Sequence, residues 1–517
     1  MLEPAATPAV PARLADPQQV LERVFGYREF RPGQREVMEA VLTGRDCIAI
    51  MPTGSGKSLT FQIPARMLAG PVLVISPLIS LMKDQVDALA RYGFRAAVLN
   101  STIPFEERRL RLAALRRGEL ELLYVAPEAL DGSLRAIIAE SRVSLMVVDE
   151  AHCISHWGHD FRPAYRRLQG LGQELGAPVL ALTATATRRV AGDIIRQLGM
   201  QKPAGYRGSF FRPNLRITVQ KKGAGRETRK DILGIVRKRG GESGIVYALS
   251  RKSVEATSEW LQRHGVRARP YHAGLGDQER ARTQDAFARD ELDVVVATVA
   301  FGMGIDKSNV RFVIHRDMPR SIEAWTQEIG RAGRDGLASD CVLHYSWADV
   351  MGYDAFLSEI EDPEVRAETR RKTVEMFRLA DGGACRHLAL ARYFDETIEP
   401  CGASCDVCLG RGIESLIATA PARSFAKAGA GPALFAARER AALPADATTF
   451  ERLRALRRRL ADAEGVPAYI VFSDAVLRAM AESRPRTPHE MLAVPGVGPV
   501  KLERYGAAFL AALAEEG

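Results

Sequence analysis

The chain has 517 residues, of which 46% are hydrophobic and 26% charged, and this balance is typical of a globular protein with several domains. Its net charge of +9 favours a polyanionic partner such as nucleic acid, although a basic protein without such a partner would fit equally well. No stretch is apolar enough to predict a membrane span. Residues 1–16 are rich in Ala and Pro and predict a disordered tail rather than a signal peptide.

The first segment with a chemical pattern runs from Phe25 to Gln34. The amide of Gln34 carries a donor and an acceptor, which match the N6 and N7 edge of adenine. Tyr27 can stack on a base, and Arg31 can stack or reach a phosphate. An ordinary loop leading into a helix over 35–42 is the alternative. Because a phosphate-binding turn follows, we interpret the segment as an adenine-reading one.

A glycine-rich turn follows the apolar run Cys47–Met51, which predicts a buried strand. Glycines let backbone N–H groups point at phosphate, and a helix predicted after the turn adds partial positive charge. Lys57 is predicted to reach the β- and γ-phosphates of ATP, and the Ser58 hydroxyl to bind Mg²⁺. Met51 stands where the strict motif has glycine, so a chance Gly/Ser turn is the alternative. The predicted nucleotide-binding residues of this turn are Thr53, Gly54, Ser55, Gly56, Lys57 and Ser58.

Apolar runs recur along the first 200 residues and alternate with amphipathic stretches. They predict four further buried strands, at 72–75, 122–125, 145–148 and 179–182. This alternation is typical of a parallel sheet that is covered by helices on both faces. Polar motifs follow the strands directly, at the sheet edge where such folds bind their ligands.

Two acidic residues end the strand predicted at 145–148. Asp149 is predicted to hold Mg²⁺, and Glu150 to orient or deprotonate the attacking water. A surface turn with two acids is the alternative, but four apolar residues run directly into the pair. Together with the glycine-rich turn, the acids predict hydrolysis of ATP.

An aromatic-rich segment, Cys153–Pro163, leaves the same strand. Trp157 and Phe161 offer faces for base stacking, and Arg162 can contact a base or a phosphate. A core cluster is the alternative, which the interleaved polar residues disfavour. With the glycine-rich turn and the acidic pair, the segment resembles the RecQ family of superfamily-two DNA helicases. The resemblance implies that this loop, His156 included, couples binding of single-stranded DNA to ATP hydrolysis.

A second series of predicted strands and helices, residues 209–346, has no phosphate-binding turn of its own. Its motif Gln327–Gly336 matches the helicase pattern, which places Gln327 at the nucleotide. Arg331 and Arg334, three residues apart on a predicted helix, would share a face and act as arginine fingers on the γ-phosphate. A solvated basic helix is the alternative, but two glycines in the run indicate close packing.

Four of the seven cysteines cluster with the spacing C-x15-C-x3-C-x2-C. Four thiolates suit a tetrahedral structural Zn²⁺ site in a reducing compartment, whereas free or redox-active thiols are the alternative. The segment resembles the RecQ zinc module, although many members have two residues, not three, between the second and third cysteines. The predicted ligands are Cys385, Cys401, Cys405 and Cys408, and the expected buried thiols are Cys47, Cys153 and Cys341.

Residues 413–445 are rich in Ala, Gly and Pro and predict a linker. Many RecQ proteins carry a winged-helix domain here, whose β-hairpin can act as a wedge, and this segment is too short to form one. Residues 446–517 resemble the HRDC domain. A Gly-rich turn before Lys501 is predicted to hold DNA phosphate, and a plain bundle that binds a partner protein is the alternative. The helices predicted for this domain span 450–464, 467–480, 489–492 and 499–512.

The predicted architecture is α/β, with two tandem RecA-like parallel-sheet lobes, a small helical zinc-binding module and a C-terminal all-α HRDC-like domain. Their predicted ranges are 17–208, 209–346, 347–412 and 446–517. Since every ATP-site motif precedes residue 340, removing the last domain is expected to leave DNA-dependent ATPase activity largely unchanged, while binding of structured DNA should weaken.

The predicted activity is that of an ATP- and Mg²⁺-dependent helicase that moves 3′ to 5′ on single-stranded DNA and unwinds duplex or branched DNA in repair and recombination. An RNA-dependent ATPase and an ATP-gated DNA-binding clamp with little strand separation stand as alternatives. We expect a monomer in the bacterial cytoplasm, associated with the nucleoid, with single-strand-binding or recombination proteins as candidate partners.

Overall fold

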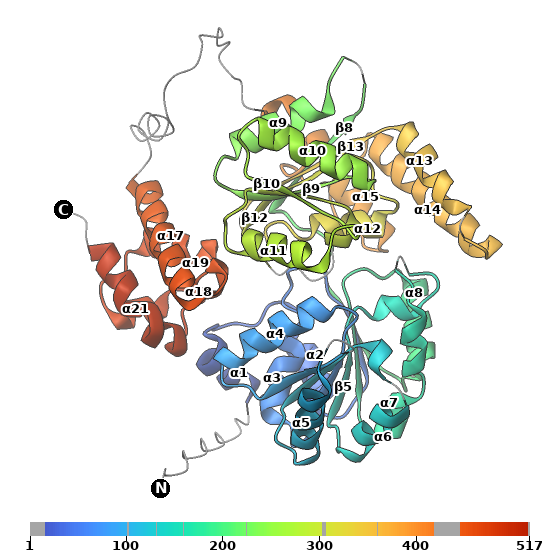
Figure 1. Ribbon diagram of the computed structural model, residues 1–517, viewed down its shortest axis with the longest axis vertical. Helices are drawn as coiled ribbons and strands as arrows, with labels where there is room; N and C mark the ends of the chain where they lie inside the picture. Colours follow the sequence, from blue (N-terminus) through green and yellow to red (C-terminus); the bar gives the residue numbers. More distant parts are fainter. Residues whose placement is uncertain are drawn as a thin grey trace.

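The chain forms two sheet-based lobes, a helical module and a C-terminal helical domain (Figure 1). The predicted N-terminal tail and most of the predicted linker lie outside the residues that the structure describes. The computed structural model describes residues 16–100, 103–130, 132–158, 160–223, 225–301, 307–358, 360–417 and 445–514.

The first lobe is built on a seven-stranded parallel sheet in the order β3-β4-β2-β5-β6-β1-β7. All five predicted strands are present and buried. The sequence did not predict the two edge strands, and β7 is largely accessible, so no apolar run marks it. The strands are β1 Cys47–Ile50, β2 Val72–Ile75, β3 Ala96–Leu99, β4 Leu122–Val125, β5 Leu145–Val148, β6 Val179–Thr183 and β7 Ala204–Arg207.

Helices cover both faces of this sheet, as the alternation of side chains along β1 requires. Cys47 and Ala49 pack in one core with α1–α4, while Ile48 and Ile50 pack in another with α5–α8. Short 3-10 or π turns, η1 to η4, lie between the strands and helices of this lobe. The turn η3 begins three residues after the end of β5. The elements are α1 Pro17–Val20, η1 Leu21–Phe25, α2 Gln34–Leu42, α3 Leu59–Met67, α4 Ile79–Arg91, α5 Phe105–Arg116, η2 Pro127–Ala129, α6 Gly132–Glu140, η3 Ala151–Ile154, η4 Pro163–Leu168, α7 Leu171–Leu175 and α8 Arg188–Leu198.

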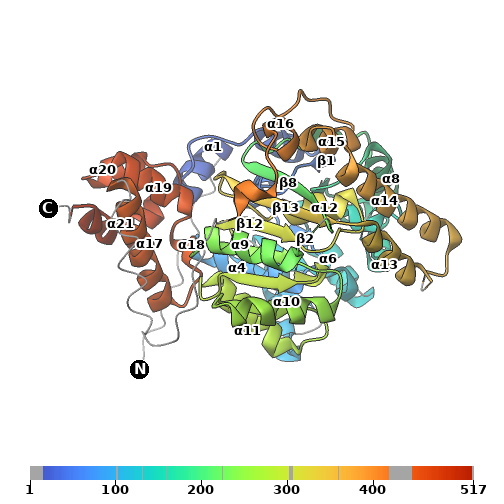
Figure 2. The same cartoon turned by 90° about the horizontal axis from the view of Figure 1, so that it is seen from above.

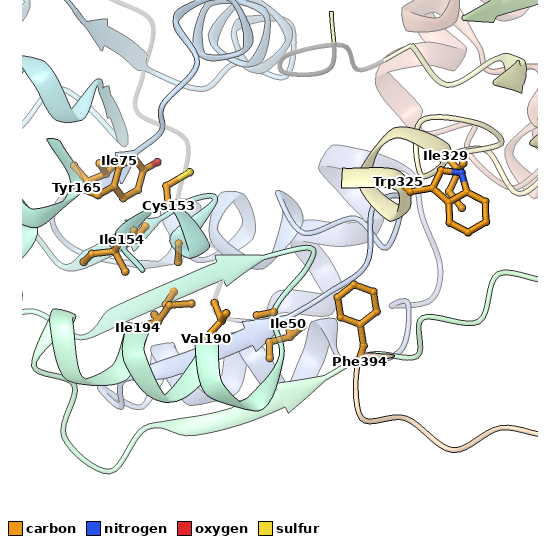
Figure 3. Close-up of a cluster of buried hydrophobic side chains, with 14 of the residues drawn as sticks. Ile50, Ile75, Cys153, Ile154, Tyr165, Val190, Ile194, Trp325, Ile329 and Phe394 are labelled. Atoms are coloured by element: carbon orange, nitrogen blue, oxygen red, sulfur yellow. The ribbon is translucent and has the colours of Figure 1, made fainter. Parts of the chain in front are cut away.

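The second lobe has a six-stranded parallel sheet in the order β10-β11-β9-β12-β13-β8. One continuous apolar core reaches from the first lobe through α12 of the second, where Trp325 and Ile329 contribute to it (Figure 3). The elements are β8 Leu215–Lys221, α9 Thr228–Lys238, β9 Ser243–Tyr247, α10 Arg251–Arg263, β10 Ala268–Tyr271, α11 Asp277–Ala288, β11 Val294–Ala297, η5 Val299–Phe301, β12 Val310–His315, α12 Ile322–Ile329 and β13 Ser339–Tyr345.

A helical module follows and is attached to both lobes. Its Phe394 stacks on Phe210 with ring centroids 4.1 Å apart, and Ile217 of β8 donates its N–H to Ser404 at 3.0 Å. Ile413, the first residue of the predicted linker, is buried against the second lobe, so the packed module extends past the predicted boundary. The elements are α13 Trp347–Leu357, α14 Pro363–Asp381, α15 Arg386–Tyr393, α16 Asp406–Leu409 and η6 Ile413–Leu416.

The C-terminal domain is a helical bundle that lies beside both lobes in two perpendicular views (Figures 1 and 2). The predicted single helix over 467–480 is wrong, because the chain is extended at Phe472 and the Ser473 hydroxyl caps a new helix. No described helix is long and apolar enough to cross a membrane. The helices are α17 Ala445–Glu464, α18 Ala468–Val471, α19 Asp474–Ser483, α20 Pro488–Ala493 and α21 Pro499–Ala514.

Candidate nucleotide site, zinc centre and DNA-binding loop

The predicted phosphate-binding turn joins β1 to α3. Gly54 and Gly56 have φ values of +88° and +79°, which favour glycine over residues with a side chain. At Gly56 an added Cβ would also lie 2.5 Å from Nε2 of Gln34. Lys57 and Ser58 follow at the start of α3, as the sequence predicts. The turn therefore has the backbone form that a phosphate cradle needs.

The predicted adenine-reading residues contact this turn directly. The buried side chain of Gln34 donates to the carbonyl oxygens of Gly56 at 2.9 Å and Ser55 at 3.2 Å. Its Oε1 accepts the backbone N–H of Arg31 at 2.9 Å, and the Arg31 guanidinium donates to the Gly54 carbonyl. In this structure the Gln34 amide thus holds the phosphate-binding turn in place and does not present its hydrogens for adenine, which differs from the prediction.

The acidic pair follows β5, as predicted. Glu150 has a φ of +47°, an unusual value for a residue with a side chain, and its N–H bonds Oδ1 of Asp149 at 2.9 Å. Burial, together with the nearby Glu150 carboxylate, raises the pKa of Asp149 to about 6, although Lys57 opposes the shift. The two carboxylates and the Ser58 hydroxyl line the same cavity, and these oxygen donors fit Mg²⁺.

The arginine pair lies in a turn and not on a helix, so the prediction of a shared helical face is wrong. The α12 helix ends at Ile329, and Gly333 takes a φ of +55° in the turn that follows. Arg331 is buried, and burial lowers the pKa of its guanidinium. The turn places both arginines on the wall of the cavity that also contains Glu150.

Arg212 is a residue that the sequence reasoning missed. It lies in the connection between the lobes, and its guanidinium donates to Thr53 in the phosphate-binding turn at 3.3 Å. The same group donates to Gly330, Ala332 and Gly333 in the arginine turn, at 3.1, 3.0 and 2.6 Å. One side chain therefore joins the two halves of the site, and no spacing pattern in the sequence marks it.

These groups enclose one cavity of about 520 Å³. All the predicted nucleotide-site residues line it except Ser55. The C-terminal domain lines it too, through residues such as Tyr469, Lys501 and Tyr505, which the sequence did not predict. The predicted site residues of the two lobes that line the cavity are Tyr27, Arg31, Gln34, Thr53, Gly54, Gly56, Lys57, Ser58, Asp149, Glu150, Gln327, Arg331 and Arg334.

The aromatic-rich loop begins three residues after the acidic pair, and its rings are covered by cations. Phe161 stacks on His156 at 3.9 Å, with the Arg166 guanidinium 5.5 Å from its centroid. The Arg189 guanidinium lies 3.4 Å from the ring centroid of Trp157. The predicted DNA-binding aromatic residues of this loop thus lie together. Two arginines that the sequence did not point to, Arg166 and Arg189, lie over them.

Arg162 faces back toward its own lobe. Its guanidinium pairs with Asp160 at 3.2 Å and donates to the carbonyl of Pro77 at 3.2 Å. The carbonyl of Trp157 accepts a hydrogen bond from Lys372 of the helical module at 2.9 Å. The loop is therefore tied both to its own lobe and to the module.

The four predicted zinc ligands converge. Their sulfur atoms all lie within 4.8 Å of one another, which suits tetrahedral coordination of one ion. Burial opposes ionisation of Cys385, but backbone N–H groups, that of Cys401 first, outweigh it and lower its pKa to about 7. A buried ion pair between Arg386 and Asp406, 3.0 Å long, fixes α16 beside the cluster.

Known protein families match the chain in the same order as its domains. The DEAD/DEAH box helicase profile matches residues 31–194, and the helicase conserved C-terminal domain profile matches 227–336. The RecQ zinc-binding profile matches 347–409, and the HRDC domain profile matches 446–513. The ATP-dependent DNA helicase RecQ of Pasteurella multocida is 40% identical, over 95% of this chain and 92% of its own length. The chain belongs to the RecQ family of ATP-dependent DNA helicases.

Other relatives agree with this assignment. The RecQ helicase of Bacillus subtilis is 38% identical over 95% of this chain and 97% of its own length. Among solved structures, the DUF1998 helicase MrfA bound to DNA shares the fold at 16% identity, with a TM-score of 0.55, over 72% of this chain and 57% of its own. The Mycobacterium smegmatis helicase Lhr, bound to single-stranded DNA and AMP-PNP, has a TM-score of 0.50 and 21% identity, over 91% and 75% of the two chains.

This RecQ helicase lacks residues that a relative has. Its alignment with the Pasteurella multocida protein spans 586 positions, more than the 517 residues of the chain, so that relative has residues without a counterpart here. Only residues 410–445 separate the zinc-binding and HRDC matches. Every described element after Cys408 is helical, so no described strand there could form a hairpin wedge.

Lys501 of the HRDC domain does not lie as predicted. It was expected beside a DNA phosphate, but it lines the cavity between the lobes, with its ammonium 5.4 Å from the Phe472 ring centroid. Burial and the charge of Arg91 lower its pKa to about 8. In this arrangement the turn before Lys501 packs on the first lobe, so it is not open to DNA.

Proposed function

We propose that this helicase hydrolyses Mg²⁺-bound ATP and moves 3′ to 5′ along single-stranded DNA, separating duplex or branched DNA in repair and recombination. The observation that carries the proposal is the single cavity shared by both lobes. The first lobe lines it with the phosphate-binding turn and two acids, and the second with two arginines. Neither lobe holds a complete set of groups, so turnover depends on how the lobes meet.

The roles follow from where each group lies on the cavity wall. Lys57 binds the β- and γ-phosphates, while Ser58 and Asp149 hold Mg²⁺, which neutralises charge on the phosphate oxygens. Glu150 orients the attacking water, and Arg331 and Arg334 stabilise charge that develops on the γ-phosphate. The remaining predicted nucleotide contacts are Tyr27, Arg31, Gln34, Thr53, Gly54, Ser55, Gly56 and Gln327.

DNA is proposed to act on the site through the aromatic-rich loop. Trp157 and Phe161 stack on bases, and His156 and Arg162 contact the strand. The loop starts at Cys153, three residues after Glu150, so a shift of the loop is proposed to move Glu150. Its rings are now covered by Arg166 and Arg189, and a DNA strand would take over those aromatic faces.

A strand-displacement assay tests polarity. Duplexes with a 3′ or a 5′ single-stranded tail are incubated with ATP, and only the 3′-tailed duplex is expected to separate. Equal separation of both would overturn the polarity. ATPase stimulation by RNA as strong as that by DNA would favour the RNA-dependent alternative, and ATP-dependent binding without separation would favour the clamp.

We further propose a monomer in the bacterial cytoplasm, associated with the nucleoid, with single-strand-binding or recombination proteins as partners. The proposed compartment is supported by the thiols outside the zinc cluster. Cys47, Cys153 and Cys341 are buried, and burial raises the pKa of each. Such thiols suit a reducing compartment. Light scattering after size exclusion should give the mass of one chain, 56.6 kDa.

A further inference from the structure

The HRDC domain packs against the part of the first lobe that is predicted to read adenine, at Gly26. We propose that this domain completes the ATP site and that Lys501 is a nucleotide-binding residue. This inference rests on the proposed function, because it takes the shared cavity to be the ATP site. Tyr469, Lys501 and Tyr505 supply part of the third wall, beside Tyr27 and Arg91 of the first lobe.

The first contact is backbone against backbone. Gly26 lies next to Tyr27, and an added Cβ on Gly26 would come within 2.4 Å of the Cα of Gly498. A Cβ on Gly498 would lie 2.7 Å from the Cα of Gly26. No side chain fits at either position without separating the domain from the lobe. The contact places the turn before Lys501 on the segment predicted to read adenine.

The second contact is a buried cluster of charges on the second lobe. Arg457 of the HRDC domain is fully buried, donates to Asp474 at 2.8 Å and lies 3.8 Å from Asp290 of the second lobe. Asp290 also pairs with the buried Lys307. At the edge of the cluster, Arg454 donates to the carbonyl of Gly241 at 2.6 Å. The domain therefore touches both lobes.

This cluster reaches the arginine turn. Asp474 lies 3.5 Å from Arg311, and Arg311 also pairs with Asp335, one residue after Arg334. Each side of the interface carries its own balance of charge: Arg457 with Asp474 on the domain, and Arg311 with Asp335 on the lobe. Separation would leave no buried charge without a partner, so docking can be reversible.

Lys501 has the chemistry of a ligand-binding group. No carboxylate of the described residues pairs with it or with the neighbouring Arg91, and Nη1 of Arg91 is buried without a hydrogen-bond partner. Two cations that no described carboxylate pairs with, on the wall of a cavity, suit an anionic ligand with many oxygen acceptors. A nucleoside triphosphate, through its ribose or phosphate oxygens, is such a ligand.

The test measures the affinity of the full-length protein for a fluorescent ATP analogue. Lys501→Ala should weaken binding about tenfold, as expected for one charged hydrogen bond, and Lys501→Arg should restore most of it. Gly498→Ala, which blocks docking, should weaken binding by a similar factor. The matched control Gly192→Ala, on α8 where an added Cβ would meet only the end of the Arg196 side chain at 4.0 Å, should bind as the wild type does.

Arg454→Ala provides a second undocking variant at a partly exposed site, in case Gly498→Ala fails to fold. Its control is Arg459→Ala, an exposed arginine on the same helix. Wild-type affinity in Lys501→Ala, or in both undocking variants, would overturn the inference. So would weaker DNA binding by Lys501→Ala with unchanged nucleotide affinity. Lys57→Ala separates the two proposals: if it turns over ATP normally, the cavity is not the ATP site.

Discussion

The two lobes have the same type of sheet and contribute different groups to the shared cavity. In the first lobe, left-handed glycines at 54 and 56 turn the backbone toward the ligand, and the side chains that follow are one lysine and two acids. In the second lobe, the left-handed Gly333 shapes a turn that presents two arginine side chains. The difference shows that the residues after each strand or helix, and not the sheet, decide which groups a lobe brings to the cavity.

At the cavity, two residues connect the phosphate-binding turn to the arginine turn. Arg212 binds the phosphate-binding turn and the arginine turn with one guanidinium, and Gly330 packs against Thr53, where a Cβ would approach to 2.9 Å. Such close contact leaves little freedom at the junction. We expect a substitution in the first lobe to affect a different step of the ATPase cycle from the corresponding substitution in the second lobe.

The largest effect is expected in the first lobe. Lys57→Ala should abolish ATP turnover, because the lysine is assigned to the phosphates and lines the cavity rather than the core. Zinc content and unfolding temperature should stay those of the wild type. Phosphate-release assays with single- and double-stranded DNA measure the loss, and normal turnover would remove the phosphate-binding turn from the mechanism.

The matching change in the second lobe should lower turnover and spare binding. Arg331→Ala or Arg334→Ala is expected to reduce the rate at saturating ATP about 10³-fold, the lower end for arginine fingers. Affinity for a fluorescent ATP analogue should change by less than about threefold, since the first lobe holds most of the ligand. An equal loss of affinity and rate would show that the two lobes do not divide the work in this way.

Local patterns in the sequence were enough to predict the parts of each lobe. Buried strands read as apolar runs, and the cysteine spacing identified a cluster whose sulfur atoms do converge. The sequence could not predict which residues form the contacts between the lobes, or between the C-terminal domain and the first lobe. Arg212 lies in no motif, and the docking of Gly498 on Gly26 depends on two residues 472 positions apart. The arginine turn was predicted as a helix because a three-residue spacing fits either structure.

That lesson changes one expectation. Because all ATP motifs precede residue 340, the last domain seemed dispensable for turnover. The structure places Tyr469, Lys501 and Tyr505 on the cavity wall, so its removal should weaken ATP affinity. A motif search finds groups that act within one lobe. It does not find residues that a domain distant in the sequence contributes to the wall of the cavity.

The zinc module should matter to the second lobe more than to the first. Ser404 and Asp406 accept backbone hydrogen bonds from β8, so the cysteine cluster supports the edge of that sheet. Cys408→Ser should lose zinc and lower the unfolding temperature by about 5 °C or more. Nucleotide affinity measured below that temperature should persist, because the phosphate-binding turn is on the other sheet. An unchanged unfolding temperature would contradict a structural role.

Trp157 tests the link between DNA and the first lobe. Base stacking contributes about 1–3 kcal/mol, so Trp157→Ala should weaken the apparent DNA affinity in ATPase assays about 5- to 150-fold. Basal ATPase should change little. Arg189→Gln is the matched variant, since it removes the cation over the ring and keeps the ring. If basal and DNA-stimulated rates fall equally in Trp157→Ala, the residue belongs to the core.

The smallest effect is expected from the substrate itself. Every described element after Cys408 is helical, and we expect base-pair separation to come from the two lobes and the aromatic-rich loop. We expect the helicase to advance into bases freed by fraying, which depends on duplex stability, about 1.4 kcal/mol of stacking per step on average. Unwinding should therefore slow several-fold as GC content rises, as measured by strand displacement on forks of equal length. Translocation on single strands of the same composition should not slow, because no pairs have to open. An unwinding rate that is indifferent to GC content would mean that the protein actively splits the duplex, with a wedge built from one of the lobes.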